Sequence, residues 1–223
     1  MISGILCYLP SPLFAASPGP YVAARAGTSI EGFTSNRIWS DLVGRTDSFY
    51  DHSDSAALMA AAAAAGYAFE APFRVEVEYA YRGQFQHDKR PTNNGSHNVN
   101  IDTTTQTLML NGYFEFREMS KVFTPFLSAG IGWARHSTDA SAYPTGATAY
   151  YESRGQEIDR FAWAVGCGVG FALSDRLALD VSYRYIDLGE GAWENYAAAT
   201  GDAGHYRADL SAHEIFAGLR YAF

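Results

Sequence analysis

Apolar and polar residues alternate along much of this chain with the two-residue period of a β-strand. In residues 73–82 every odd position is Phe, Val or Tyr, and four of the five even positions are charged: Arg74, Glu76, Glu78 and Arg82. Six further stretches place apolar residues on one face and mostly polar or small residues on the other: 21–31, 107–116, 125–134, 161–171, 177–185 and 213–223. These seven stretches are predicted to be strands whose two faces meet different surroundings.

The alanine-rich segment 57–69 is ambiguous by itself, because the alanine run at 60–65 has the highest helix propensity available. Its neighbour decides the prediction. Residues 70–72 form a tight Glu-Ala-Pro turn that leads directly into the strand at 73–82, so the two segments are expected to pair as a hairpin. The alanine run is therefore predicted to be an eighth strand, with small side chains.

Short turns and long loops alternate between these strands. The expected turns are 70–72, 117–121 and 174–176, and the expected polar loops are 32–55, 84–103, 135–157 and 187–209. Outer-membrane barrels have this asymmetry. A soluble eight-stranded barrel or sandwich is the alternative, but a narrow interior could not hold the face that carries Tyr, Trp, Phe and Leu. The chain is predicted to be all-β, an eight-stranded antiparallel up-and-down transmembrane β-barrel.

The composition agrees with a chain in which apolar and polar residues alternate strictly. Of the 223 residues 48% are hydrophobic and 15% aromatic, yet the mean hydropathy is slightly negative. The longest nearly unbroken apolar stretch, 56–69, is too short for a spanning helix. The net charge of −8, without a basic cluster, gives no footprint for a nucleic-acid partner. The two cysteines, Cys7 and Cys167, allow no disulfide framework or cysteine-rich metal site, and no cofactor is expected.

The amino-terminal segment has the pattern of a signal peptide. An apolar run within residues 5–14 is followed by the small residues Ala15, Ala16 and Ser17. No Lys or Arg follows Met1, which a truncated start would explain, and a disordered apolar tail is the alternative. We expect residues 1–17 to be the signal peptide and residues 18–223 to be the barrel domain.

The face opposite the bulky residues carries matched charges, and this face is expected to line the barrel interior, or lumen. Five basic residues stand against five acidic ones: Arg25, Arg74, Arg82, Arg184 and Arg220 against Glu76, Glu78, Glu115, Asp180 and Glu214. Unpaired charges in so narrow a space would be costly. The sequence therefore predicts an ion-pair network that fills the lumen, with inward glycines at 130, 132, 166, 168 and 170 leaving room for bulky neighbours such as Phe126 and Tyr113.

Several blocks of the sequence resemble the opacity-type and porin-like outer-membrane surface proteins of Gram-negative bacteria. The blocks are FTPFLSAGIGWA at 123–134, FAW at 161–163 before a glycine-rich strand, LDVSYRYIDLG at 179–189 and the terminal GLRYAF at 218–223. The resemblance covers nearly the whole mature chain. It implies a location in the bacterial outer membrane and a surface-exposed structural protein, adhesin or immune target. It also implies that the alternating carboxy terminus, with Tyr221 and Phe223, is the signal read by the barrel assembly machinery.

Candidate catalytic and metal-binding residues are few. Ser211, His213 and Glu214 stand together, but in a strand Glu214 points away from the other two. A second pair, His136 and Ser137, opens a predicted loop. Residues 52–54 and the pair at 87–88 lack the spacing of a metal site and fit solvated loops better. The aspartates at 47, 51 and 54 could bind a cation at the cell surface, but acidic spacing in a loop is weak evidence for such a site.

We therefore expect a non-catalytic integral outer-membrane barrel with a structural role and four extracellular loops for interaction or antigenicity. Two alternatives stay open, a narrow porin-like channel for small solutes and a lipid-modifying outer-membrane hydrolase. The expected partners are outer-membrane lipid, the assembly machinery and host or surface ligands of the loops.

Overall fold

The computed structural model describes the backbone of residues 18–40, 46–47, 55–89, 97–117, 123–144, 151–197 and 202–223. Side chains are described for residues 18–32, 57–83, 104–117, 123–137, 157–190 and 209–223. The predicted signal peptide at 1–17 lies outside these ranges. Within them, no helix is long and apolar enough to cross a membrane.

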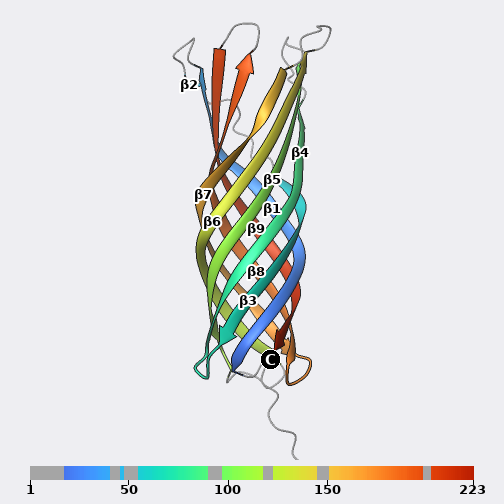
Figure 1. Ribbon diagram of the computed structural model, residues 1–223, viewed down its shortest axis with the longest axis vertical. Coiled ribbons are helices and arrows are strands. Elements are labelled where there is room, and N and C mark those ends of the chain that lie inside the picture. Colours follow the sequence, from blue (N-terminus) through green and yellow to red (C-terminus); the bar gives the residue numbers. More distant parts are fainter. Residues whose placement is uncertain are drawn as a thin grey trace, which may run out of the picture.

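Eight long antiparallel strands form a closed barrel (Figure 1). Neighbours in sequence are neighbours in space, and β1 closes the barrel on β9 through a register that includes Tyr21 opposite Ala222. A two-residue strand, β2, pairs with the end of β1. The predicted eight-stranded up-and-down barrel is confirmed. The strands are β1 (Gly19–Ser40), β2 (Thr46–Asp47), β3 (Ser55–Ala68), β4 (Phe73–Lys89), β5 (His97–Glu115), β6 (Phe123–Pro144), β7 (Tyr151–Ala172), β8 (Leu177–Ala197) and β9 (Asp202–Ala222).

The alanine run is a strand, as its hairpin partner predicted. Strand β3 pairs with β1 from Ser55 to Ala68 and with β4 from Ala60 to Ala68. Residues 69–72 form the turn between β3 and β4. The ladder on both sides supplies the backbone hydrogen bonds, so tertiary pairing overrides the helix propensity of alanine.

The outer surface of the barrel is an apolar belt between two bands of exposed aromatic side chains. Aliphatic side chains such as Val77, Leu110 and Ile131 lie between the bands. On β6, ten residues separate Phe123 from Trp133; this is about 33 Å of strand, which spans about 25 Å at a tilt of 40°. The belt thus has the height of a lipid-facing band. The band near the short turns contains Tyr67, Phe69, Phe73, Phe114, Phe116, Phe123, Phe171, Tyr221 and Phe223, and the far band contains Tyr79, Tyr81, Trp133, Phe161, Trp163 and Tyr183.

The strands run well beyond the far band, which corrects the predicted loops. The expected loop at 135–157 contains the last ten residues of β6 and the first seven of β7, and β1, β4, β5, β8 and β9 also extend into expected loops. The pairing continues there, for example from His97 opposite Pro144 to Thr107 opposite Ala134. Alternation disappears because the outward face no longer contacts lipid, whereas backbone pairing does not depend on side-chain polarity. Strand bounds read from alternation were therefore too short at this end.

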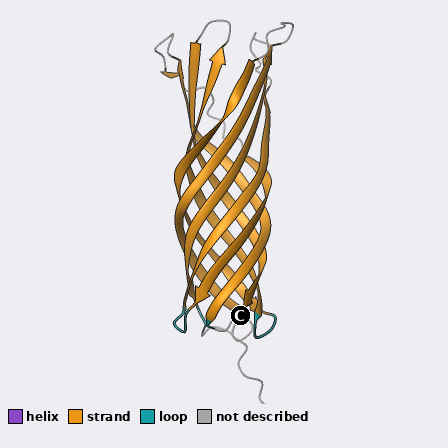
Figure 2. Ribbon diagram, viewed as in Figure 1, coloured by secondary structure: helices purple, strands orange, loops and turns teal. Residues whose placement is uncertain are grey.

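Two pairings stop early, so the far end of the barrel separates into two groups of strands (Figures 1 and 2). Strand β4 pairs with β3 only up to Arg82 opposite Ala60, and β7 pairs with β8 only up to Trp163 opposite Asp187. At the second position Gly189 has a φ of 76°, which favours glycine, and the β8–β9 register shifts there. Beyond these points β4 to β7 form one group, and β1, β8 and β9 form the other together with β2 and the first residues of β3.

If the belt faces lipid, an arginine should be most harmful at its middle. We expect Leu110→Arg to lower the free energy of unfolding by about 2–4 kcal/mol in phospholipid vesicles. The matched control is Leu173→Arg, because Leu173 is exposed in the turn between β7 and β8; there the cost should be about 0–1 kcal/mol. Equal destabilisation of the two variants in denaturant titrations would contradict a lipid-facing belt.

Candidate functional site

The ten charged residues predicted to face inward all lie in the lumen and are all buried. They come from β1, β4, β5, β8 and β9, so the side chains must cross the lumen to meet. The structure joins them into one continuous chain of alternating charges, in the order Arg82, Glu214, Arg184, Glu78, Arg25, Glu76, Arg74, then Glu115 and Asp180, and finally Arg220.

The half of this charge chain nearer the far end is held by two bridging carboxylates. Glu214 accepts hydrogen bonds from Nε of Arg82 at 2.6 Å and from Nε of Arg184 at 2.5 Å. Glu78 accepts from Nη1 of Arg184 at 2.5 Å and from Nη1 of Arg25 at 2.7 Å. Each carboxylate therefore joins arginines from two different strands, and charge-assisted bonds of this length are among the stronger ones in proteins.

The half nearer the short turns combines ion pairs with aromatic rings. Glu76 receives hydrogen bonds from Arg25 and from the hydroxyls of Tyr21 and Tyr113. The Arg74 guanidinium lies 3.6 Å from the centre of the Tyr113 ring and donates to Glu115 at 3.0 Å. Such cation–π contacts gain strength when water is excluded. This end of the lumen is closed by packed rings and paired charges.

Residues without side chains on β6 and β7 make room for this packing. A Cβ at Gly168 would collide with the Phe126 ring, and one at Gly130 would collide with the Asn111 amide. Phe126 in turn makes an edge-to-face contact with Tyr113, with ring centres 5.6 Å apart. These inward glycines thus make room for larger neighbouring side chains, as the sequence predicted.

At the far end an apolar cluster occupies one side of the lumen. It includes Met109, Ile186, Leu188 and Leu210 with several alanines. His136 anchors its edge: Nε2 lies 3.1 Å from the Leu188 carbonyl oxygen, and Nδ1 lies 3.1 Å from Oγ1 of Thr105. The lumen is therefore filled by charges, rings and aliphatic side chains along its described length.

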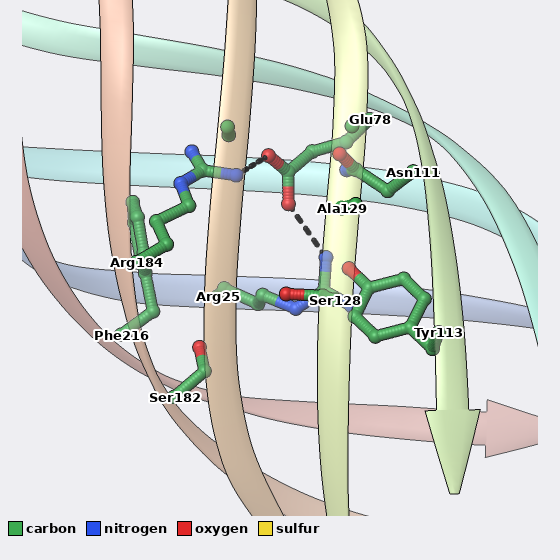
Figure 3. A pocket seen from close by; sticks show the side chains of 11 residues that line it. Arg25, Glu78, Asn111, Tyr113, Ser128, Ala129, Ser182, Arg184 and Phe216 are labelled. Atoms are coloured by element: carbon green, nitrogen blue, oxygen red, sulfur yellow. Dashed lines mark hydrogen bonds and ion pairs between the residues drawn. The ribbon is translucent and has the colours of Figure 1, made fainter.

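A small cavity among the described residues lies beside the middle of the charge chain (Figure 3). The centre of a water-sized particle can move through about 20 Å³ of it, where one water needs about 10–15 Å³. Arg25, Glu78 and Arg184 line one part, and Asn111, Ser128 and Ser182 contribute polar groups. The cavity can hold one small particle, which is too little for a continuous aqueous path.

Comparison with known proteins agrees with this architecture. The sequence profile of the family described as "Outer membrane protein beta-barrel domain" matches residues 6–223. The chain belongs to this outer-membrane β-barrel family. Outer membrane protein PagN of Salmonella typhimurium is 29% identical over 237 aligned positions, which cover 98% of each chain. This barrel is accordingly a protein of the bacterial outer membrane.

Two solved structures share the fold. The outer membrane protein OprG from Pseudomonas aeruginosa has a TM-score of 0.62 and 15% identity, covering 94% of this chain and 99% of its own. Neisserial surface protein A has a TM-score of 0.55 and 20% identity, covering 92% of this chain and 97% of its own. At these identities the likeness concerns the fold alone.

Four further polar residues of the lumen were not among the ten predicted ion-pair residues, although Tyr113 was expected to face inward beside the glycines. Tyr21 and Tyr113 donate hydroxyls to Glu76, and Arg117 donates to Glu115 at 2.9 Å. Glu31 lies on the inward face of β1 and is only 2% exposed. Alternation from Arg25 could have identified Glu31, and the same rule applies to the two tyrosines. Arg117 follows the end of β5, where alternation gives no signal.

The candidate catalytic residues do not form a catalytic group. His213 lies on the outer surface, with Nδ1 2.7 Å from the Tyr183 hydroxyl, whereas Glu214 is fully buried in the charge chain. His136 points into the lumen, held by Thr105 and Leu188. Among the described residues no three His, Cys, Asp or Glu side chains cluster as a metal site would require. The side chains of the candidates at 47, 51–54 and 87–88 lie outside the described residues.

The proposed assembly residues are on the outer face. Tyr221 and Phe223 are exposed and meet edge to face, with ring centres 5.6 Å apart. They form part of the aromatic band near the short turns. Their recognition by the assembly machinery stays a prediction of the sequence resemblance.

The bridging position of Glu78 gives a test of the charge chain. Glu78→Ala should lower the free energy of unfolding by about 3 kcal/mol, because Arg25 and Arg184 would each lose a buried partner. The matched control is Asp159→Ala at the exposed pair with Arg135, where the Arg135 hydrogen bond holds the pKa of Asp159 below its usual value. This control should be close to neutral, as exposed ion pairs usually are. Unfolding midpoints that are the same for wild type and Glu78→Ala would contradict a stabilising chain.

Proposed function

We propose that this protein is a non-catalytic, non-conducting barrel of the outer membrane that presents the far ends of its strands as an interaction surface outside the cell. The observation that carries the proposal is the contrast between a filled lumen and strands that extend beyond the lipid-facing belt. A barrel built for transport would need an open interior.

The proposed orientation follows from the asymmetry of the connections. The short turns at 69–72 and 173–176 lie at one end of the barrel, together with the carboxy terminus (Figure 1). Outer-membrane barrels place short turns in the periplasm and long connections outside. The extended ends of β4 to β9 would then stand above the outer leaflet.

A catalytic role has no support among the described side chains. A hydrolase needs a nucleophile within hydrogen-bond reach of a base that a third group orients. His213 contacts Tyr183 on the outer surface, and Glu214 is bound by two arginines on the inside. The barrel wall separates the two groups that a Ser–His–Glu arrangement would have to join.

The split far end suits recognition. Two groups of strands with unpaired edges at β4 and β7 offer backbone donors and acceptors, which a ligand can contact directly. Segments of this kind can change in sequence without disturbing the belt or the lumen. A host or surface ligand of these ends is the partner that we propose.

Conductance separates this proposal from a narrow channel. In planar bilayers the refolded barrel should show no steady ion current, because packed rings and ion pairs fill the described part of the lumen. The current through Glu78→Ala should be compared with that through the wild type, because this variant removes a bridge inside the lumen. A steady current through the wild-type protein would establish the channel alternative.

The surface role is tested by shortening the far end. We would replace residues 33–55, 84–103, 138–156 and 191–208 with short turns, and compare bacteria that display either form. The shortened barrel should still fold, which a difference in gel mobility between boiled and unboiled samples would show, because belt and lumen are intact. Bacterial binding to host-cell or matrix surfaces should fall to the level of cells without the protein. Equal binding by bacteria displaying the two forms would contradict a recognition role.

A further inference from the structure

A sixth buried carboxylate lies at the far end of the lumen, outside the charge chain. Glu31 on β1 points inward and is only 2% exposed, and its Oε1 has no hydrogen-bond partner among the described residues. Each of the five acids of the charge chain is bound by at least one arginine, whereas none of the described ion pairs includes Glu31. A buried carboxylate without a partner is costly when it is charged.

The two charged groups that act on Glu31 have opposite effects. Arg82 on β4 attracts the carboxylate, and Glu214 on β9 repels it. The Arg82 guanidinium is already engaged, because Nε donates to Glu214 at 2.6 Å and Nη1 donates to Oγ1 of Thr107 at 3.1 Å. Its Nη2 has no partner but forms no described ion pair with Glu31. Arg82 therefore compensates the Glu31 charge only in part.

The balance of charges along the lumen gives the same result. The charge chain contains five arginines and five carboxylates and is neutral without Glu31. Arg117, a further arginine, pairs with Glu115 at the opposite end of the barrel. An ionised Glu31 would therefore leave one unmatched negative charge at the far end of the lumen.

The other described strands around this site bring no buried charge to it. His136 on β6 is titratable, but burial lowers its pKa, so the ring is uncharged at neutral pH. Arg160 and Glu190 are only partly buried and lie at the gap between β7 and β8. The buried side chains from β3, β5 and β8 are uncharged: Leu58, Ala60, Thr105, Thr107, Ile186 and Leu188.

Burial has the largest effect on the Glu31 carboxyl group. Removal from water raises the pKa of Glu31 from 4.5 to about 7, because the attraction by Arg82 and the repulsion by Glu214 are smaller effects. The residue lies beyond the lipid-facing belt. Thr28, which precedes it on β1, pairs with Ile215, and Ile215 pairs with Tyr183 of the far band.

We propose that Glu31 is a proton-binding site that makes the far end of the barrel sensitive to pH. In mildly acidic solution the protonated carboxyl group is neutral and leaves Arg82 to Glu214. Near neutral pH the proton passes to water, and the new carboxylate competes with Glu214 for the Arg82 guanidinium. Arg82 is also the residue at which β4 stops pairing with β3. The proton thus changes the charge at a point where the two groups of strands separate.

The direction of the pH dependence follows from the tighter binding of this proton in the folded barrel than in the unfolded chain. The contribution of Glu31 to stability should be full below pH 4.5, decrease as the pH rises to about 7, and then stay constant. His136 acts in the opposite direction, because its pKa is lowered in the folded state. The effect of Glu31 is therefore measured against a variant that lacks only its carboxyl group.

Glu31→Gln keeps the shape of the protonated side chain but cannot ionise. Denaturant titrations in lipid vesicles would give the unfolding equilibrium constants of wild type and variant. The ratio of the wild-type constant to the variant constant should rise about 10- to 100-fold between about pH 5 and about pH 8, where the variant should be the more stable protein. A ratio that is the same at both pH values would contradict the proposal, because Glu31 would then be a permanently charged partner of Arg82 or a permanently neutral group.

Glu157→Gln is the matched control. Glu157 lies at the same end of the barrel, but its side chain is 69% exposed. The same substitution there should leave the pH dependence of the wild type unchanged. A pH dependence that Glu157→Gln removes as well would place the effect outside Glu31 and overturn the proposal.

Infrared spectroscopy of the folded barrel gives a readout that does not depend on unfolding. The absorption band of a protonated carboxyl group should be present in the wild type at about pH 5, disappear by about pH 8, and be missing from Glu31→Gln at both. Absence of the band from the wild type at the lower pH would overturn the proposal even if the variant failed to fold, as would a band that Glu31→Gln retains in full.

Discussion

The constraint on which this structure depends is the narrow interior of an eight-stranded barrel, which must be filled without leaving a charge unpaired. The protein meets it with one chain of alternating charges instead of separate pairs. Glu214 joins Arg82 on β4 to Arg184 on β8, and Glu78 joins Arg184 to Arg25 on β1. Glu214 and Arg184 lie on the adjacent strands β9 and β8, but the other three contacts tie strands that are not neighbours in the sheet. The charge chain therefore braces the cross-section of the barrel, which backbone pairing between adjacent strands cannot do alone.

Small residues in the barrel wall leave space for these long side chains. The inward alanines at 60 and 62 on β3 pack with Ala80 and Phe216, and the inward Gly168 on β7 admits the ring of Phe126. Large side chains at these places would compete with arginine for the same volume. Where the match is incomplete, beside Asn111 and Arg184, the small cavity remains. Its polar lining is thus a consequence of the way in which the charge chain is packed.

Much of the fold could be predicted because lipid and lumen impose opposite demands on successive residues. Alternation identified the strands and placed all ten network residues on the inward face, and the hairpin with 73–82 identified the alanine run. Partners across the lumen could not be predicted, because Arg184 meets Glu78 only after the barrel closes. Glu31 follows the same alternation but lies where the predicted first strand ended. The strand extensions were missed because backbone pairing continues beyond the belt, where the outward face no longer contacts lipid and apolar and polar residues no longer alternate.

The same reasoning explains why recognition would belong to the far end. Within the belt, each side chain either contacts lipid or packs in the lumen, so few positions are free to change. Beyond Trp163 on β7 and Asp187 on β8 the two strands separate, and the Arg160 side chain donates to the Glu190 carbonyl across the gap. One backbone carbonyl at this gap therefore accepts from a side chain and not from a strand neighbour. A region held in this way tolerates substitution while the braced barrel below keeps it in place, and this separation of demands is what a variable recognition surface requires.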